Sequence, residues 1–170
     1  MGRAPPAPAV TGTDARRRAH YLAALGIDAY ASRRAPAVPA VAADELAGEW
    51  ATLRAAVAGC TKCRLCETRT QTVFGVGDTR ARWLVVGEAP GAEEDKRGEP
   101  FVGRAGQLLN SMLRAVALSR DTVFIANVLK CRPPGNREPR PDEVAACLPY
   151  LERQIALIEP ALILAVGRTA

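Results

Sequence analysis

The sequence predicts an α/β domain built on a parallel sheet, and three short apolar runs are the basis for that prediction. The runs at 83–86 and 123–128 are rich in β-branched residues, as buried parallel strands are. Between them apolar residues recur at helical spacing, which gives a strand-helix-strand unit. A third run at 161–166 follows another helical pattern. Parallel strands joined by helices bring the loops at their carboxyl ends to one edge of the sheet.

Apolar residues at spacings of three and four predict four helices: 14–25, 44–58, 108–116 and one that opens at Pro141 and continues to Ile158. Residues 1–13 and 34–42 are rich in Ala and Pro, which is typical of disordered chain and of linkers. We therefore expect an N-terminal extension with a linker over 1–43, and one folded domain over 44–170.

The positive charge of the chain comes almost wholly from arginine. The 170 residues include 23 Lys and Arg against 18 Asp and Glu, and only three are lysine. Arginine suits bidentate contact with phosphate, and the loop from Arg132 to Arg140, together with Lys130, could grip a nucleic-acid backbone. A biased genome composition and a solvated loop are the ordinary alternatives. No run approaches the ~18 apolar residues of a membrane span, and the start lacks a signal peptide, so we expect a cytoplasmic protein.

Cysteines form the first group of candidate ligands. Cys60 and Cys63 make a C-x2-C pair, a spacing that lets two thiolates reach one metal centre, and Cys131 and Cys147 follow later. A reducing compartment and an odd number of cysteines argue against a disulfide framework. On spacing alone a zinc site, an iron-sulfur cluster and a set of plain buried thiols all remain open, and Cys66 is either a ligand or a bystander.

The loop after the first strand, which opens with Gly87-Glu88-Ala89-Pro90-Gly91, is the candidate ligand site, because ligands bind beyond the carboxyl ends of strands. Phe101 offers a stacking platform for a planar base. The amide of Asn127 can donate to one base-edge atom and accept from another, so the pair could hold a flipped base. A core aromatic, a strand-end hydrogen bonder and, for Glu93-Glu94-Asp95, a solvated loop are the ordinary alternatives.

Four motifs in this order are more specific than any one of them. They are CTKC at 60–63, GEAPGAEED at 87–95, PFVGRAGQLLN at 100–110 and NVLKCRPP at 127–134. From about residue 53 to 170 the chain resembles the family 4 uracil-DNA glycosylases, which are iron-sulfur enzymes. The resemblance implies a three-layer α/β/α fold with a parallel sheet.

The resemblance also implies a structural [4Fe-4S] cluster on Cys60, Cys63, Cys131 and Cys147, with Cys66 as an extra thiol. Such a cluster would tie the segment before the first strand to the loop and helix beyond the second. The implied partner is uracil-containing DNA, and we expect a monomer without membrane contact.

The implied chemistry is hydrolysis of the bond between uracil and deoxyribose, with the nucleotide flipped into a pocket. Phe101 would stack on uracil and Asn127 would bond its N3-H and O4 edge. Cytosine presents the opposite pattern there, so it would leave buried groups unpaired. Amides around Glu88 and Ala89 would contact a uracil oxygen, and Glu88 would help to hold the loop or the attacking water. Glu94 would crowd the C5 position and reject the methyl group of thymine.

Family members continue past the third strand with a fourth strand and a His-Pro loop, whose histidine stabilises charge on the departing uracil. The sequence stops at Ala170 without them, so we expect the last strand and helix to be missing from the fold. The expectation is a truncated glycosylase that is severely impaired or inactive. The alternative is an iron-sulfur module that binds nucleic acid without catalysis.

Overall fold

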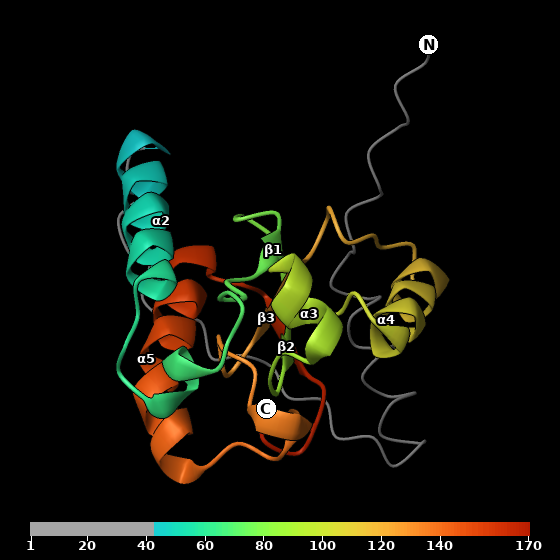
Figure 1. Ribbon diagram of the computed structural model, residues 1–170. Coiled ribbons are helices and arrows are strands. Elements are labelled where there is room, and N and C mark those ends of the chain that lie inside the picture. Colours follow the sequence, from blue (N-terminus) through green and yellow to red (C-terminus); the bar gives the residue numbers. More distant parts are fainter. Residues whose placement is uncertain (1–42) are drawn as a thin grey trace. The chain divides into compact units, whose positions relative to one another are not determined.

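In the computed structural model, which describes residues 43–170, a four-stranded sheet lies between helices (Figure 1). The predicted N-terminal helix over 14–25 and the linker over 34–42 lie outside the described residues. None of the helices within residues 43–170 is long and apolar enough to cross a membrane.

The sheet has the order β1-β3-β2-β4. Its strands are β1 (Val76–Gly77), β2 (Trp83–Gly87), β3 (Phe124–Asn127) and β4 (Leu162–Ala165). The central strand β2 runs parallel to both β3 and β4, as predicted, whereas β1 pairs antiparallel with β3. In the register of β2 and β3, Gly87 stands opposite Asn127, so both strands end at the same level. Their following loops therefore leave the sheet side by side.

Helices cover both faces of the sheet (Figure 1). One face packs against α2 (Ala43–Ala58) and α5 (Pro141–Ile158), and the other against α4 (Arg104–Ala115). Neighbouring side chains of β2 alternate between the two layers, since Leu84 and Val86 join the α2 and α5 side while Val85 joins the α4 side. The predicted three-layer α/β/α arrangement is confirmed, with a sheet that is mixed at one edge.

Four short elements escaped prediction: β1, the helix α3 (Ala92–Arg97), and the 3-10 turns η1 (Arg64–Glu67) and η2 (Pro134–Asn136). In α3 the one buried residue is Asp95, so no apolar periodicity marks it. The glycines at its two ends mark α3 instead. Gly91 is the residue before the helix, and Gly98 ends it in a left-handed conformation.

Helix α4 uses only part of its predicted apolar face. Leu109 and Leu113 are buried against the sheet, but Leu108, Met112 and Val116 are 64%, 50% and 58% exposed. The amphipathic pattern thus predicted the helix correctly and overstated the width of its buried stripe.

Candidate functional site

The loops after β2 and β3 meet at the end of the sheet because backbone pairing continues past both strands. The amide of Val128 donates to the Gly87 carbonyl at 2.9 Å, and that of Leu129 donates to the Glu88 carbonyl at 3.0 Å. The two loops are thereby held in register beyond the last strand residues. A cavity of about 310 Å³ opens between them.

All five residues predicted to act on the substrate line this cavity. Its walls are formed by Glu88, Ala89, Gly91, Glu94, Phe101, Ala105, Asn127 and Val166. The lining comes from the loop after β2, helix α3 and the segment after it, the start of α4, the end of β3 and the residue after β4. Residues that lie up to 78 positions apart in the sequence, Glu88 and Val166, thus share one small pocket.

Asn127 is 2% exposed and stands at the end of β3. Within residues 43–170 its side-chain amide has no hydrogen-bonding partner, while its backbone carbonyl accepts a bond from Lys130 Nζ at 2.8 Å. The Lys130 ammonium also donates to Gln154 Oε1 at 2.7 Å. Burial lowers the pKa of Lys130 to about 7. Lys130 and Gln154 therefore hold the backbone of Asn127 in place, and the side-chain amide of Asn127 can bond to a ligand in the cavity.

Gly87 makes room for the side chains of Asn127 and Phe101. A Cβ atom at this position would collide with Asn127 Oδ1 and would lie 2.6 Å from Phe101 Cζ. Only glycine lets the amide and the aromatic ring close over the end of β2 together. The Phe101 ring is half-buried and packs on the α4 side of the core.

The Glu88 carboxylate is half-buried at the mouth of the cavity. Its Oε2 atom accepts a hydrogen bond from the Thr169 hydroxyl at 2.8 Å. This contact joins the loop after β2 to the segment after β4. A carboxylate fixed in this way can orient a water molecule at the open side of the site.

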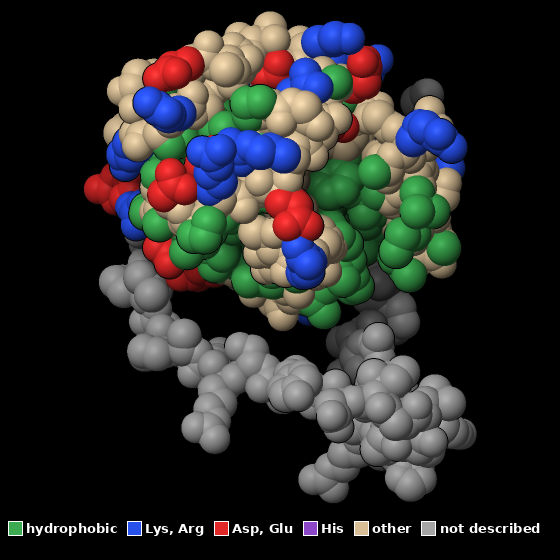
Figure 2. Space-filling view, turned by 60° about the horizontal axis from the view of Figure 1, so that its bottom comes forward, with side chains coloured by type: hydrophobic (Ala, Val, Ile, Leu, Met, Phe, Trp, Pro, Cys, Tyr) green, Lys and Arg blue, Asp and Glu red, His purple; other side chains and the backbone are tan. Residues whose placement is uncertain are grey.

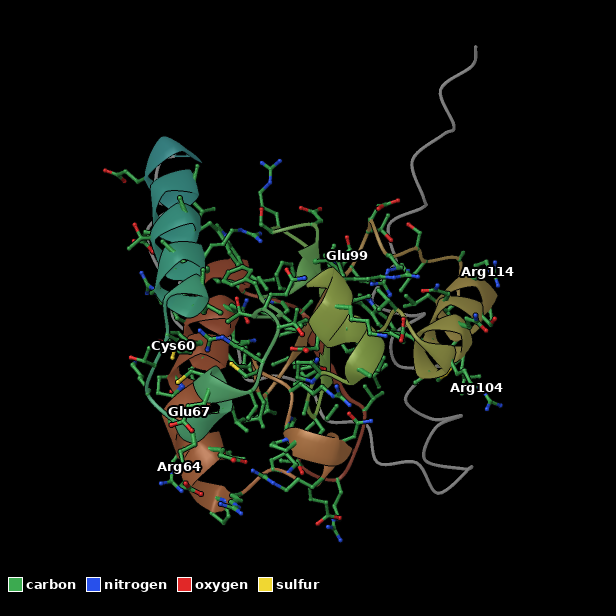
Figure 3. All side chains as sticks on the ribbon, in the orientation of Figure 1. Cys60, Arg64, Glu67, Glu99, Arg104 and Arg114 are labelled. Carbon is green, nitrogen blue, oxygen red and sulfur yellow. The ribbon has the colours of Figure 1, made fainter. Side chains whose placement is uncertain are left out.

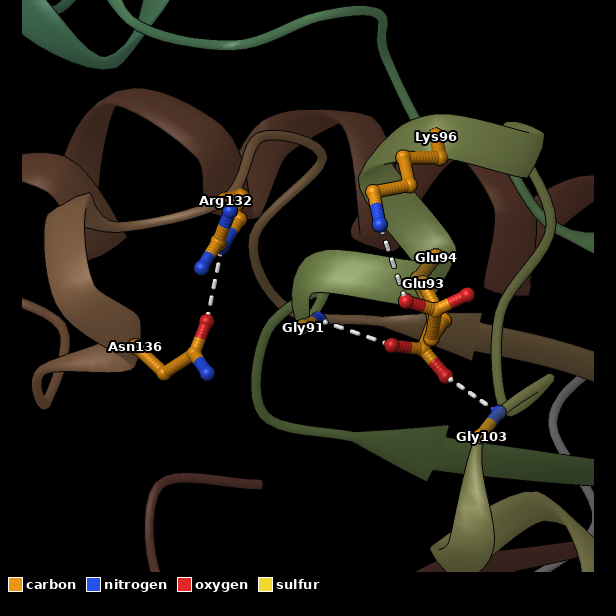
Figure 4. A network of polar contacts seen from close by, with 7 residues as sticks. All are labelled: Gly91, Glu93, Glu94, Lys96, Gly103, Arg132 and Asn136. Carbon is orange, nitrogen blue, oxygen red and sulfur yellow. Dashed lines mark hydrogen bonds and ion pairs between the residues drawn. The ribbon is translucent and has the colours of Figure 1, made fainter.

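The Glu94 carboxylate is tied to the backbone of two loops (Figure 4). It accepts bonds from the amides of Val102 at 2.8 Å, Gly103 at 3.0 Å and Gly91 at 3.1 Å. Burial alone would raise the pKa of Glu94, but these backbone hydrogen bonds outweigh it and lower the pKa below its ordinary value. Glu94 is thus an anion that lines the cavity and fixes its rim.

The three neighbouring carboxylates have separate surroundings. Glu93 is exposed and pairs with Lys96 at 3.1 Å, as a solvated loop would predict (Figure 4). Asp95 is instead 3% exposed and accepts bonds from the Thr70 amide at 3.0 and 3.1 Å. Asp95 therefore anchors α3 to the preceding segment, and Glu94 alone reaches the cavity.

The four predicted cluster ligands lie on the α2 and α5 side of the sheet. Cys131 and Cys147 belong to the buried core, and Cys60 and Cys63 pack against that core. Sulfur atoms gather beside the labelled Cys60 (Figure 3). Three segments far apart in the sequence, namely the chain after α2, the loop after β3 and helix α5, are brought together here.

The pKa values of these thiols are raised by burial and by the closeness of the cysteines to one another. Burial raises the pKa of Cys131 to about 11, against the opposing effect of the Arg69 guanidinium, and Cys147 and Cys63 raise it further. Burial likewise raises the pKa of Cys147, and the neighbouring Cys63 and Cys60 add to that rise. Binding to a metal centre would hold these thiols as thiolates and release their protons.

Hydrogen bonds to two of the sulfur atoms suit an iron-sulfur cluster. Arg69 Nη1 donates to Cys131 Sγ at 3.2 Å, and the Lys130 amide donates to Cys147 Sγ at 3.2 Å. Among residues 43–170 no three His, Cys, Asp or Glu side chains converge closely enough to chelate a single metal ion. A [4Fe-4S] cluster asks for a wider arrangement, because each of four thiolates binds a different iron. The donor set and its second layer of donors fit that group.

The basic loop after Cys131 is only partly free to contact a ligand. Arg132 Nε donates to Asn136 Oδ1 at 2.7 Å (Figure 4), and Arg137 forms an ion pair with the buried Glu143. On the face drawn in Figure 2, Lys and Arg side chains are scattered among acidic and hydrophobic ones. The sequence suggested that Lys130 and this loop grip phosphate together. The structure instead buries Lys130, which is 1% exposed and bonds to Gln154, and uses part of the loop for internal contacts.

Sequence reasoning did not identify two residues that hold the site, Arg120 and Thr169. Arg120 lies between α4 and β3 and donates to the carbonyls of Pro100 and Phe101. Its segment has no periodicity or motif that would single it out. Thr169 lies in the turn that follows β4, and only its placement beside Glu88 reveals a role.

Comparison with known proteins agrees with this geometry. A family model described as the uracil DNA glycosylase superfamily matches residues 74–170. The Type-4 uracil-DNA glycosylase of Sulfurisphaera tokodaii is 54% identical over 113 residues, 66% of this chain and 51% of that protein. That of Archaeoglobus fulgidus is 53% identical over 114 residues, 67% of this chain and 57% of its own length. That of Thermotoga maritima is 53% identical over 111 residues, which are 65% of this chain and 58% of that protein.

The chain spans about half the length of these curated relatives. The resemblance expected from the four motifs is confirmed, since the similar proteins are Type-4 enzymes. Because the family model covers more than half of the sequence, the chain belongs to the uracil DNA glycosylase superfamily.

Proposed function

We propose that the cavity at the ends of β2 and β3 binds a uracil flipped out of DNA, and that the protein hydrolyses the bond between this base and deoxyribose. The observation that supports the proposal most directly is the shared lining of the cavity. Glu88, Ala89, Glu94, Phe101 and Asn127, each expected from the motifs to act on uracil, all border it. Its volume of about 310 Å³ suits a single base rather than a larger ligand.

Asn127 and Phe101 would recognise the base. The free amide of Asn127 can accept from N3-H and donate to O4, while the Phe101 ring stacks on the face of uracil. Cytosine carries an acceptor at N3 and a donor at N4, so it would leave two buried polar groups facing like groups. Selection of uracil over cytosine thus follows from the orientation of one amide.

Glu94 would select against thymine. Its carboxylate is fixed by three backbone amides and borders the cavity, so it cannot swing away from a bulky substituent. The 5-methyl group of thymine would have to displace a bound anion. Uracil has only a hydrogen at that position.

Glu88 would hold the attacking water, with Thr169 keeping its carboxylate in place. In the reaction the water oxygen bonds to C1′ of the sugar and the C1′–N1 bond breaks, so its electron pair leaves with uracil, and the proton that the water loses ends on the uracil anion. Backbone amides near Ala89 would stabilise the negative charge that gathers on a uracil oxygen.

We further propose that Cys60, Cys63, Cys131 and Cys147 bind a [4Fe-4S] cluster. When bound, the cluster would be structural, linking the chain after α2 to the loop after β3 and to α5. The substrate would be uracil-containing DNA in the cytoplasm, and the protein would act as a monomer.

The test is excision of uracil from a labelled single-stranded oligonucleotide, with protein purified without oxygen and checked for the visible absorbance of the cluster. We expect strand cleavage after alkali at the uracil position, at a rate far below that of a chain extended by the His-Pro loop, and none with thymine or cytosine there. Binding of the oligonucleotide without release of uracil would contradict the hydrolase and identify a nucleic-acid-binding module instead. If the protein neither binds the oligonucleotide nor releases uracil, the proposed function is wrong.

A further inference from the structure

Phe101 is held in a backbone conformation that bulky residues avoid. Its φ angle is +53°, in the left-handed region, although it is not a glycine. Such a residue persists only where its surroundings determine the conformation, and strain of this kind collects at ligand sites. Something in the structure must therefore hold the loop over 100–103 in place.

One side of this loop is held by Arg120. The guanidinium donates to the Pro100 carbonyl at 2.7 Å and to the Phe101 carbonyl at 3.0 Å, and more weakly to Asn110 Oδ1 of α4 at 3.4 Å. Arg120 is half-buried in the turn between α4 and β3. A planar, permanently charged fork suits two neighbouring carbonyls better than a single donor would.

The other side of the loop is held by Glu94, which accepts bonds from the next two amides, those of Val102 and Gly103. Four successive residues therefore have their backbone fixed by two side chains of opposite charge. The carbonyls point to the cation and the amides to the anion. Phe101 lies between these two anchors, with its ring over Gly87 and beside Asn127.

We propose that Arg120 is a positioning residue that holds the strained Phe101 in its stacking orientation before any base arrives. The role in base stacking rests on the proposed function, whereas the effect on Phe101 itself does not. Arg120 lies outside the lining of the cavity, so it acts through Phe101 rather than by touching the base. Its removal would let the backbone relax toward ordinary φ values and turn the ring away from Gly87.

Fluorine NMR can test this directly, because the chain has only three phenylalanines, Phe74, Phe101 and Phe124. Protein labelled with 4-fluorophenylalanine should give three signals, two of them from buried core residues that report on folding. Arg120→Gln and Arg120→Met both remove the guanidinium and keep most of the side-chain stem. The matched control is Arg114→Gln, since the exposed Arg114 makes a side-chain hydrogen bond only to Ser111 among the described residues.

In both Arg120 variants we expect the Phe101 signal to shift or broaden while the other two stay in place, and Arg114→Gln to resemble the wild type. Titration with uracil should shift the wild-type Phe101 signal, and the variants should bind about tenfold more weakly. A displaced Phe101 signal in the variants, combined with a wild type that does not respond to uracil, would support the positioning role and count against the proposed function.

Two results would overturn the inference. One is a Phe101 signal that keeps its wild-type position and width in Arg120→Gln and Arg120→Met. The other is displacement of all three signals in both variants, which would show that Arg120 supports the whole fold rather than Phe101.

Discussion

Asn127 is 2% exposed, lines the cavity, and its side-chain amide has no hydrogen-bonding partner among residues 43–170, so the amide can bond to a ligand there. We expect Asn127→Ala to lower the rate of uracil excision by roughly 10²–10³-fold, the size typical for loss of one catalytic-site donor. Single-turnover assays on a uracil oligonucleotide would measure it. Asn136→Ala is the control, because Asn136 is exposed and bonds to Arg132. An Asn127→Ala protein at the wild-type rate would contradict the assignment of base recognition.

The lowered pKa of Glu94 predicts a pH dependence of stability. A carboxyl group whose folded-state pKa is depressed stabilises the fold above its ordinary value of 4.5, and this contribution is lost as the pH falls through the folded-state pKa. At pH 7 we therefore expect Glu94→Gln to unfold at a lower temperature than the wild type. The two melting temperatures should converge below about pH 4.5.

Thermal melts from pH 3 to 8, followed by circular dichroism, would show this convergence. Glu93→Gln is the matched control, since its exposed carboxylate pairs with Lys96 at the surface. Parallel melting curves for Glu94→Gln and wild type across the whole range would contradict the pKa argument.

The first turn of helix α4 packs closely against the backbone of Phe101, and Gly106 permits this close approach because it has no Cβ atom. A Cβ at Gly106 would collide with the carbonyl group of Phe101. Gly106→Ala should therefore destabilise the fold by about 1–3 kcal/mol, as overpacking does. In α2, Gly48 has no atom within 4 Å of an added Cβ, so Gly48→Ala should stabilise by about 0.5–1 kcal/mol. Chemical denaturation of both variants would test the opposite signs, and a Gly106→Ala protein as stable as the wild type would show that the close approach to Phe101 does not matter.

At the scale of elements, the spacing of apolar residues predicted those helices and strands that bury one or both faces in the core. The strands β2, β3 and β4 and the helices α2, α4 and α5 all lie close to their expected positions. Periodicity could not reveal β1, which has two residues, or α3, whose buried residue is a carboxylate. These elements depend on tertiary contacts, such as the bonds from the Thr70 amide to Asp95.

The same distinction holds for the site. Glu88, Phe101 and Asn127 stand in motifs, so the sequence could nominate them, and the cavity brings them together. Arg120 and Thr169 act through hydrogen bonds to groups 19 to 81 positions away in the chain. No local pattern encodes such a contact. Supporting residues are therefore visible only once the fold has placed them.

At the scale of the whole domain, the two layers of the core have different supports. The α4 side is a small apolar cluster, with Val85, Leu109 and Ile125 among its members. The α2 and α5 side is larger, and it includes the buried Cys131 and Cys147, with Cys60 and Cys63 packed against it. These thiols come from three segments, the chain after α2, the loop after β3 and α5. A cluster bound there would hold the layer that supports the backbone of β3 and hence Asn127.

This arrangement predicts separate outcomes for two cysteines. Cys131 is 4% exposed, accepts a hydrogen bond from Arg69 and lies in the loop that directly follows β3. Cys131→Ser should therefore abolish the visible absorbance of the cluster and lower the melting temperature by about 10 °C or more. Cys66→Ser should keep both, because Cys66 is outside the proposed ligand set. Iron and acid-labile sulfide, measured per chain in protein purified without oxygen, would check the assignment. Equal loss of iron in the two variants would mean that Cys66 is a ligand, and full retention in Cys131→Ser would remove Cys131 from the set.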